Sequence, residues 1–408
     1  MNILYLTADD AAGQQFNGYL LHKTLKELGH DSHMAVAQSS LNEPDIFEVA
    51  SGSYRRINSL LVRIERALSL QSILPVSALT LYFSSYYRNA DIVHLQLLHA
   101  LPFFSLLNVP LMSRQHRVVW TIHDPWLMSG HCIHSLDCDR WLTGCGDCPD
   151  LTLPLPLKRD TSAFNWKLKN WVTRHSTVSL IVASEWMYDR VRRSPILSHL
   201  PCSLIPFGIN TDVFRPLNQV ECRSRFGIPG DANVIAFRWT PHFIVKGASY
   251  IEKALDSLEL DKPTYLLTFD AMHGLDSLKN KYHLVELGWV DDRNLMAAAL
   301  NAADIFLMPS IGEAFGMIAV EAMACGTPVI VFEGTSLPSV IHAPHGGIAV
   351  PYKDHEALAG AIKLLLKDRI LHQTQVENGL KIVQQEYTLD LYVRRHLELY
   401  EKLMAKEP

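Results

Sequence analysis

The stretch from Gly312 to Val331, GEAFGMIAVEAMACGTPVIV, holds only two acids, Glu313 and Glu321, among small and apolar residues. Its pattern predicts a loop, a short helix beginning at Phe315 or Gly316, and a strand. Eight residues at ~100° each leave the two carboxylates about 80° apart around the helix axis and ~12 Å apart along it. Glycosidases need carboxyl groups ~5–5.5 Å or ~6.5–9.5 Å apart, so the spacing argues against a hydrolytic pair.

This spacing suits a long ligand that is touched at both ends, with an anion held by the helix start between them. A nucleotide diphosphate sugar has that layout, because its sugar and ribose carry hydroxyls on either side of a charged diphosphate. In the structural alternative, Glu313 is an acid favoured by the helix dipole and Glu321 is a solvated helix residue. The spacing alone leaves both interpretations open. Gly326 is expected to end the helix in a left-handed conformation.

The whole chain predicts an α/β protein. Its 408 residues are 48% hydrophobic and 19% charged, with a net charge of −5, which is typical of a globular protein and gives no signal for nucleic-acid binding. Short apolar runs alternate with helical patterns, so we expect two doubly wound parallel sheets. The expected strands are 2–7, 32–37, 91–97, 118–124, 178–184, 202–206, 234–239, 264–269, 283–289, 304–310 and 328–332. A segment rich in proline and glycine near 205–233 separates the halves, which predicts domains at 1–205 and 206–385 and a final helix within 386–408.

Three features bear on location. The N-terminal MNILYLTADD lacks a signal-peptide pattern, no window reaches ~18 consecutive apolar residues, and seven cysteines fit a reducing compartment. We therefore expect a cytoplasmic protein. Four arginines along segment 53–70 are compatible with peripheral contact at the inner face of the plasma membrane, although a solvated helix face is the simpler interpretation; they are Arg55, Arg56, Arg63 and Arg66.

The motif E-A-F-G, four residues, E-A-M-A-C-G-T-P-V-I resembles the E-x7-E signature of retaining glycosyltransferases of the GT-B fold, in family 4 (group 1). LGWVDDRNLMAAALNAADIFLMPS resembles the family's stretch before the signature, and LIPFGINTDVFRP its interdomain connection. WTIHDPWLMSGHCIHSLDCDRWLTGCGDCP resembles a bacterial subgroup that includes colanic-acid and exopolysaccharide transferases. The resemblance covers nearly the whole chain. It implies an acceptor-side domain at 1–205 that faces a nucleotide-sugar domain at 206–385 across a cleft, and a helix at 386–408 that crosses back to the first domain.

The resemblance also implies roles in the second domain. Glu313 would face the donor sugar and Glu321 the ribose, while Phe315, Gly316 and Met317 would bind the substrate near the helix start. In FRWTPHFIVKG, Arg238 and Lys246 would stabilise the diphosphate leaving group, a task that fixed cations perform without a metal. The alternative is a pair of surface cations, and Phe237 replaces the glycine usual before the arginine.

In the first domain, His123 and Asp124 end the predicted strand VVWTIHD. A neutral imidazole there can donate to a sugar hydroxyl, and the family often has such a histidine; a hydrogen-bonded core histidine is the alternative. Asp124 would bond the acceptor or orient the loop. The loop with Gly13 would approach the substrate, because glycine allows close backbone contact. Gln96 stands where the subgroup often has histidine.

Four cysteines cluster within 132–148, and two histidines lie nearby. A structural zinc ion is one interpretation, although the spacings are not those of a standard zinc ribbon; free or redox-paired thiols are the other. The cysteines are Cys132, Cys138, Cys145 and Cys148.

The resemblance implies a retaining, metal-independent hexosyltransferase without a catalytic cofactor. It would transfer a sugar from a GDP- or UDP-sugar to a saccharide or lipid-linked acceptor in bacterial cell-surface polysaccharide synthesis, by front-face displacement as the domains close. The alternatives are a sugar-nucleotide epimerase, a phosphorylase of the same architecture, and a non-catalytic sugar-nucleotide-binding scaffold. The sequence does not identify the base, the sugar, the acceptor or the oligomeric state.

Overall fold

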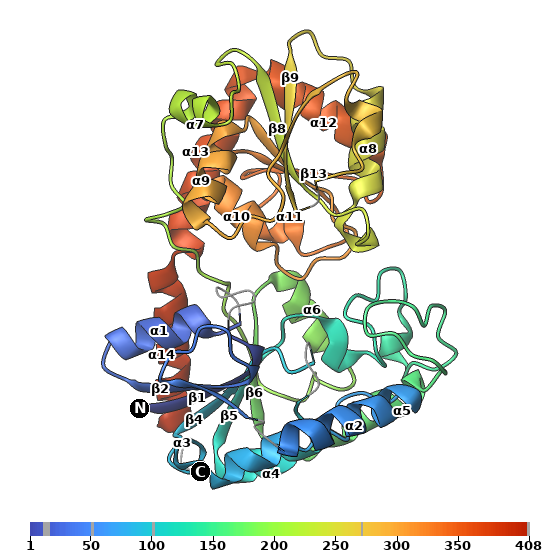
Figure 1. Ribbon diagram of the computed structural model, residues 1–408, viewed down its shortest axis with the longest axis vertical. Helices are drawn as coiled ribbons and strands as arrows, with labels where there is room; N and C mark the ends of the chain where they lie inside the picture. The colour runs from blue at the N-terminus through green and yellow to red at the C-terminus, as the bar shows by residue number, and fades with distance from the viewer. Residues whose placement is uncertain (11–16, 50–52, 100–102, 271, 406–408) are drawn as a thin grey trace. The chain divides into compact units, whose positions relative to one another are not determined.

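The computed structural model describes residues 1–10, 17–49, 53–99, 103–270 and 272–405. The chain forms two compact units (Figure 1). Unit 1 combines Met1–Phe207 with Tyr392–Pro408, and unit 2 is Gly208–Leu391. We expected domain boundaries after residues 205 and 385. Each unit is an α/β domain built around one parallel sheet, as the alternation of strand and helix patterns predicted.

The sheet of unit 1 has seven strands in the order β3-β2-β1-β4-β5-β6-β7, and all neighbours pair in parallel. Its central strands are buried along most of their length, as parallel strands covered by helices on both faces must be. The strands are β1 Asn2–Asp9, β2 Asp31–Gln38, β3 Ile46–Glu48, β4 Ile92–Leu95, β5 Arg117–Thr121, β6 Val178–Val182 and β7 Cys202–Leu204. Strand β3, of three residues, was not predicted.

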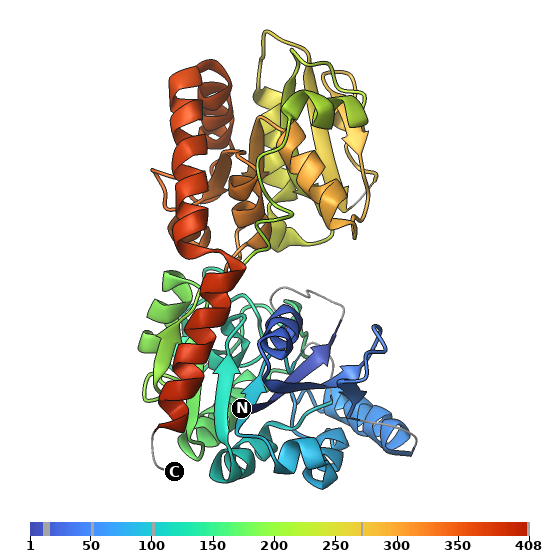
Figure 2. The ribbon, with the colours of Figure 1, turned by 90° about the vertical axis from the view of Figure 1, so that its left-hand side faces the viewer.

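The α-helices of unit 1 include the last helix of the chain, α14, which packs against β1 and β4 (Figure 2). The hydroxyl of Tyr400 lies 3.2 Å from that of Tyr5 and 2.6 Å from Nδ1 of His94. The buried positions of α14 are Tyr392, Val393, His396 and Tyr400. The helices are α1 Tyr19–Glu27, α2 Ser53–Ala67, α3 Ser85–Arg88, α4 Val109–Gln115, α5 Ser162–Arg174, α6 Glu185–Arg193 and α14 Leu389–Met404. Short 3₁₀ turns are η1 Ser77–Phe83, η2 Leu106–Asn108, η3 Pro125–Met128 and η4 Arg140–Leu142.

Unit 2 has a six-stranded parallel sheet in the order β10-β9-β8-β11-β12-β13. The strands are β8 Asn233–Trp239, β9 Thr264–Asp270, β10 His283–Glu286, β11 Ile305–Met308, β12 Val329–Phe332 and β13 Ile348–Val350. The helices are α7 Gln219–Arg225, α8 Ala248–Ser257, α9 Arg293–Ala302, α10 Met317–Ala324, α11 Leu337–Val340, α12 His355–Lys367 and α13 Arg369–Glu386, with 3₁₀ turns η5 Ile244–Lys246 and η6 Asp276–Leu278. The unpredicted β13 is again only three residues long.

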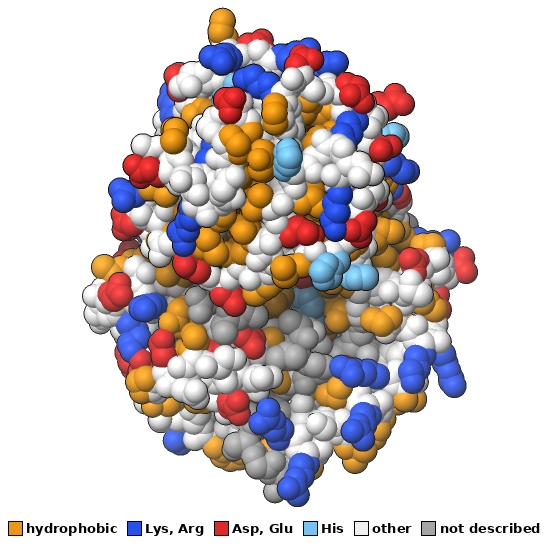
Figure 3. Space-filling view, turned by 45° about the horizontal axis from the view of Figure 1, so that its top comes forward, with side chains coloured by type: hydrophobic (Ala, Val, Ile, Leu, Met, Phe, Trp, Pro, Cys, Tyr) orange, Lys and Arg blue, Asp and Glu red, His pale blue; other side chains and the backbone are white. Residues whose placement is uncertain are grey.

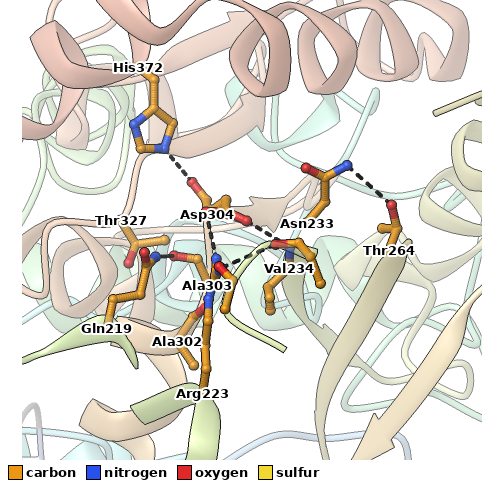
Figure 4. A network of polar contacts seen from close by, with 12 residues as sticks. Gln219, Arg223, Asn233, Val234, Thr264, Ala302, Ala303, Asp304, Thr327 and His372 are labelled. Atoms are coloured by element: carbon orange, nitrogen blue, oxygen red, sulfur yellow. Dashed lines mark hydrogen bonds and ion pairs between the residues drawn. The ribbon is translucent and has the colours of Figure 1, made fainter. Parts of the chain in front are cut away.

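A buried polar network fixes the frame of unit 2 (Figure 4). Arg223 of α7 pairs with Asp304 Oδ1 at 2.7 Å and donates to Ala302 O at 3.0 Å. Asp304 Oδ2 accepts from the amide of Val234, and its carbonyl accepts from His372 Nε2. These bonds join α7, β8, β11 and α13. They hold the beginning of β11, the strand that precedes Glu313, in place. In the described ranges no helix is both long and apolar enough to span a bilayer.

Candidate functional site

The candidate residues of unit 2 meet at the carboxyl ends of β8, β9 and β11, the edge where open α/β sheets bind ligands. Lys246 Nζ, in η5 after β8, lies 2.7 Å from Glu313 Oε2 in the loop after β11. Arg238 Nε, near the end of β8, lies 2.6 Å from Asp270 Oδ2 at the end of β9. The structure therefore brings Arg238, Lys246 and Glu313 to one edge and gives each an oppositely charged partner.

The backbone explains why Lys246 and Glu313 come together. Gly247 has φ +76°, and a Cβ there would lie 1.9 Å from the carbonyl oxygen of Pro309. Only glycine allows this close approach between the loop after β8 and the loop after β11. The amide of Ile311 also donates to Val245 O at 2.8 Å. The two loops are thus fastened on either side of the ion pair.

The helix of the sequence signature, α10, begins at Met317, one or two residues later than predicted. Gly316 is its N-cap with φ +94°, and a Cβ there would lie 2.4 Å from Leu337 Cδ2. A glycine cap has no side chain to accept from the first amides of the helix, and such amides favour an anion. Phe315 is buried edge-to-face against Tyr387, whereas Met317 is half-buried. Gly326 ends this helix with φ +78°, which confirms the expected left-handed cap.

Glu321 lies inside α10 and is not a solvated residue, since it is 5% exposed. Its Oε1 accepts from Arg293 Nη2 of α9 at 2.8 Å. Burial raises the pKa of the Glu321 carboxyl, and the charges of Arg293 and Arg238 oppose that rise. The solvated alternative for Glu321 is therefore wrong. A buried carboxylate held by a half-exposed arginine can exchange that partner for a ligand hydroxyl.

In unit 1, His123 follows β5 and its ring stacks on Phe207 at 5.6 Å. His123 Nε2 donates to Gln96 Oε1 at 2.8 Å, and Gln96 Nε2 contacts His94 Nε2 at 3.1 Å. His94 reaches Tyr400 through its other ring nitrogen. Burial lowers the pKa of His123 to about 4, so the imidazole is neutral near pH 7. The chain of bonds fixes the ring plane and makes Nε2 the protonated nitrogen.

Asp124 caps η3, where its carboxylate accepts from the amide of Trp126 at 2.8 Å and lies 2.9 Å from His99 Nε2. Burial alone would raise the pKa of the Asp124 carboxyl, but the charge and hydrogen bond of His99 and the Trp126 amide lower it overall. His99 stacks on Trp126 at 4.6 Å. These residues, together with His123 and Gln96, line a recess of about 220 Å³. Asp124 therefore orients this loop and also faces the recess.

The four clustered cysteines line a second recess of unit 1, of about 300 Å³, together with His131. All four thiols are free. His131 Nε2 lies 3.3 Å from Cys148 Sγ, and the amide of Gly130 donates to Cys145 Sγ. Burial raises the pKa of the Cys145 thiol to about 11. No set of three or more Cys, His, Asp or Glu side chains arranged to hold a metal is found among the described residues. The zinc interpretation stays a prediction.

One predicted site residue, Gly13, lies outside the described residues. Three further residues of these two regions, Asp270, Arg293 and His99, were missed by sequence reasoning. Asp270 has φ +77°, which is uncommon for a residue with a side chain and marks functional edges. Its position at the end of TYLLTFD was a usable signal, as was Arg293 at the start of α9. His99 gave no signal, because it reaches the recess only through the pairing of β4 with β5.

A sequence model described as Glycosyltransferase Family 4 matches residues 18–213, and one described as Glycosyl transferases group 1 matches residues 242–382. The two matches do not overlap and together cover most of both units. Both describe enzymes of one class, the glycosyltransferases, and the fold and charged edge of unit 2 fit that class. The chain belongs to the group 1 glycosyltransferases of family 4, with a GT-B fold.

Among curated proteins, a D-inositol 3-phosphate glycosyltransferase of Mycobacteroides abscessus is 33% identical over 170 residues, which are 39% of this chain and 38% of that protein. A phosphatidyl-myo-inositol mannosyltransferase of Mycobacterium leprae is 37% identical over 120 residues, 29% of this chain and 32% of that protein. These matches span about a third of the relatives' lengths.

Among solved structures, sucrose-phosphate synthase from Thermosynechococcus elongatus has a TM-score of 0.70 at 20% identity, covering 99% of both chains. The Anabaena protein HepE, in complex with UDP-glucose, has a TM-score of 0.67 at 14% identity, covering 98% of this chain and 99% of that one. At these identities the likeness shows the fold alone.

Proposed function

We propose that the protein is a retaining glycosyltransferase that transfers a sugar from a nucleotide diphosphate sugar to a saccharide or lipid-linked acceptor in bacterial cell-surface polysaccharide synthesis. The observation that carries this is the edge of unit 2, where three opposite-charge pairs surround the start of α10. They are Lys246 with Glu313, Arg238 with Asp270, and Arg293 with Glu321.

Each pair supplies one part of a donor site. Glu313 would accept from the sugar hydroxyls, and Glu321 from the ribose. Arg238 and Lys246 would turn to the diphosphate, beside the amides of Phe315, Gly316 and Met317. Because the leaving diphosphate gains negative charge as the sugar bond breaks, fixed cations at this position stabilise the transition state more than the ground state.

Unit 1 would hold the acceptor. The recess lined by His123, Asp124 and Gln96 offers a neutral imidazole and an ionised carboxylate, which are suitable partners for acceptor hydroxyls. No side chain here is required as a covalent nucleophile. In the front-face displacement that the family resemblance implies, the leaving phosphate accepts the proton of the acceptor hydroxyl while the new glycosidic bond forms on the same face, so that the anomeric configuration is retained.

The first test is a thermal-shift screen against UDP- and GDP-sugars, because a ligand that binds only the native state raises apparent stability. UDP-glucose is the starting donor, since HepE was solved with it. The acceptor panel should include inositol 3-phosphate and phosphatidylinositol, to which the names of the curated relatives refer.

The decisive test is release of the nucleoside diphosphate with the donor and acceptor so identified, with the product anomer read by NMR. We expect release that depends on the acceptor and a retained anomeric configuration. Glu313→Ala and Lys246→Ala should each reduce the rate by at least ~10-fold. Both variants at the wild-type rate would refute the site. Turnover without an acceptor would point to an epimerase, and a phosphate requirement to a phosphorylase.

A further inference from the structure

Helix α2 turns two polar side chains inward. Asn58 and Glu65, seven residues apart, are its buried positions. Asn58 Oδ1 accepts from the amide of Val76 at 3.1 Å. The carboxylate of Glu65 accepts from the backbone amides of residues 72–74. On its protein side α2 therefore makes hydrogen bonds to the following loop through both of its buried side chains.

Five large apolar side chains of α2 and the residue after it are between 41% and 59% exposed, whereas Leu61 and Val62 are half-buried. At ~100° per residue the five exposed side chains fall within an arc of about 120°, along a helix ~22 Å long. An amphipathic helix normally buries such a stripe against its own domain, and a contiguous exposed stripe marks an interaction site. The stripe consists of Tyr54, Ile57, Leu60, Ile64 and Leu68.

The same helix carries only positive charge toward solvent. Its single acid, Glu65, points inward, whereas four arginines are exposed: Arg55, Arg56, Arg63 and Arg66. By the same helical arithmetic Arg56 and Arg63 lie within about 20° of each other and ~100–120° from the middle of the apolar stripe. In a chain whose net charge is −5, this concentration of cations is local.

Two neighbouring helices repeat the combination. Neither α4 nor α5 contains an acid. α4 exposes Leu111 and Arg114; α5 exposes Phe164, Lys167, Trp171 and Arg174. Asn165 Nδ2 of α5 donates to Ser69 O after α2 at 3.1 Å, and all three helices lie on one side of unit 1 (Figure 1). Figure 3 shows Lys and Arg side chains beside hydrophobic ones on the lower right of that view.

We propose that this basic apolar face, formed by α2, α4 and α5, docks on the surface of an anionic lipid bilayer. On helices that lie along a bilayer surface, apolar and aromatic side chains suit the boundary between acyl chains and headgroups, and arginines beside them suit anionic headgroups. A second copy of the chain is a poor occupant, because a symmetric contact would set arginines against arginines. The inference goes beyond the proposed transfer reaction and does not depend on which sugar is transferred.

The test is cosedimentation of the full chain with vesicles of phosphatidylcholine alone or with added phosphatidylglycerol, at low and high salt. We expect binding to the anionic vesicles that weakens with salt. Replacing two arginines, Arg56→Ser with Arg63→Ser, should weaken binding about 25-fold, since each cation contributes about 5-fold. Ile57→Ser with Ile64→Ser should weaken it by at least ~10-fold.

Matched controls come from exposed residues of unit 2, with Arg225→Ser for charge and Ile370→Ser for apolar surface; Ile370 is 82% exposed. Both should bind vesicles as the wild type does. Thermal melting checks that all variants are folded, which we expect because the replaced side chains are exposed. The proposal is overturned by equal binding to neutral vesicles, by controls that lose binding equally, or by no vesicle binding. Absent vesicle binding with concentration-dependent dimerisation would assign the face to self-association instead.

Discussion

Lys246 Nζ is paired with the carboxylate of Glu313, 2.7 Å away, and the two side chains are 23% and 14% exposed. A donor must turn Lys246 toward its diphosphate and Glu313 toward its sugar. Glu313→Gln removes the charge but keeps the shape and one acceptor oxygen. The proposed roles therefore predict opposite effects of this one substitution on the nucleotide and on the sugar.

For UDP alone, binding should tighten by up to about 5-fold. An exposed ion pair contributes ~0.2–1 kcal/mol, and a partly buried one lies near the upper end of that range. In the wild type this free energy must be given up before Lys246 can turn to the phosphate, whereas in the variant the ion pair is absent. For sugar transfer, losing a hydrogen bond to a charged acceptor costs ~1.5–3 kcal/mol, which lowers kcat/KM by about 10–150-fold.

The assay combines calorimetric titration of UDP with nucleoside diphosphate release under transfer conditions. Glu259→Gln is the matched control, because Glu259 pairs with Lys281 at 3.0 Å but belongs to no predicted site. It should change neither quantity. If Glu313→Gln weakens UDP and transfer by the same factor, Glu313 holds the nucleotide or the loop and the reasoning is refuted. An unchanged transfer rate would refute it equally.

Three further predictions concern stability and metal. Gly316→Ala should unfold at lower temperature by calorimetry, with a loss of ~1–3 kcal/mol, because its Cβ would meet Leu337 Cδ2 at 2.4 Å and φ is +94°; an unchanged melting temperature would contradict the close approach. Burial lowers the pKa of His22, His123 and His396 to about 4, below the value of ~6.5 in the unfolded chain. The unfolded chain therefore binds more protons between these two pH values, and the melting temperature should fall as the pH drops from about 6.5 toward 4. A melting temperature that does not change over this range would contradict the prediction. If the four clustered cysteines hold zinc, the purified protein should contain about one zinc per chain by elemental analysis and lose it when all four are changed to serine; metal-free wild type that titrates with four reactive thiols there would exclude zinc.

The sheets could be predicted because each long strand is a continuous apolar run bounded by turns. Strands β3 and β13, of three residues each, were missed, whereas β7, equally short and also at a sheet edge, was predicted as part of the longer run CSLIP. On α14 the buried positions include two tyrosines and a histidine, and Tyr400 is buried against His94, to which it is hydrogen-bonded. Polar residues are buried where a partner is present. Here the partner of Tyr400 is His94, which is 306 positions away in sequence.

The candidate site, like the fold, could be predicted only in part from the sequence. The sequence by itself placed Glu313 and Glu321 in one signature and Lys246 in a second segment, and showed that the chain alternates strand and helix patterns. Only the tertiary structure decided that Asp270 faces Arg238, since this follows from β9 pairing beside β8. It also decided the orientation of α2. A helical pattern fixes which residues share a face, but which face turns inward depends on the groups that the helix meets. Here Asn58 and Glu65 turn inward because they accept hydrogen bonds from backbone amides after the helix, and the apolar stripe stays exposed.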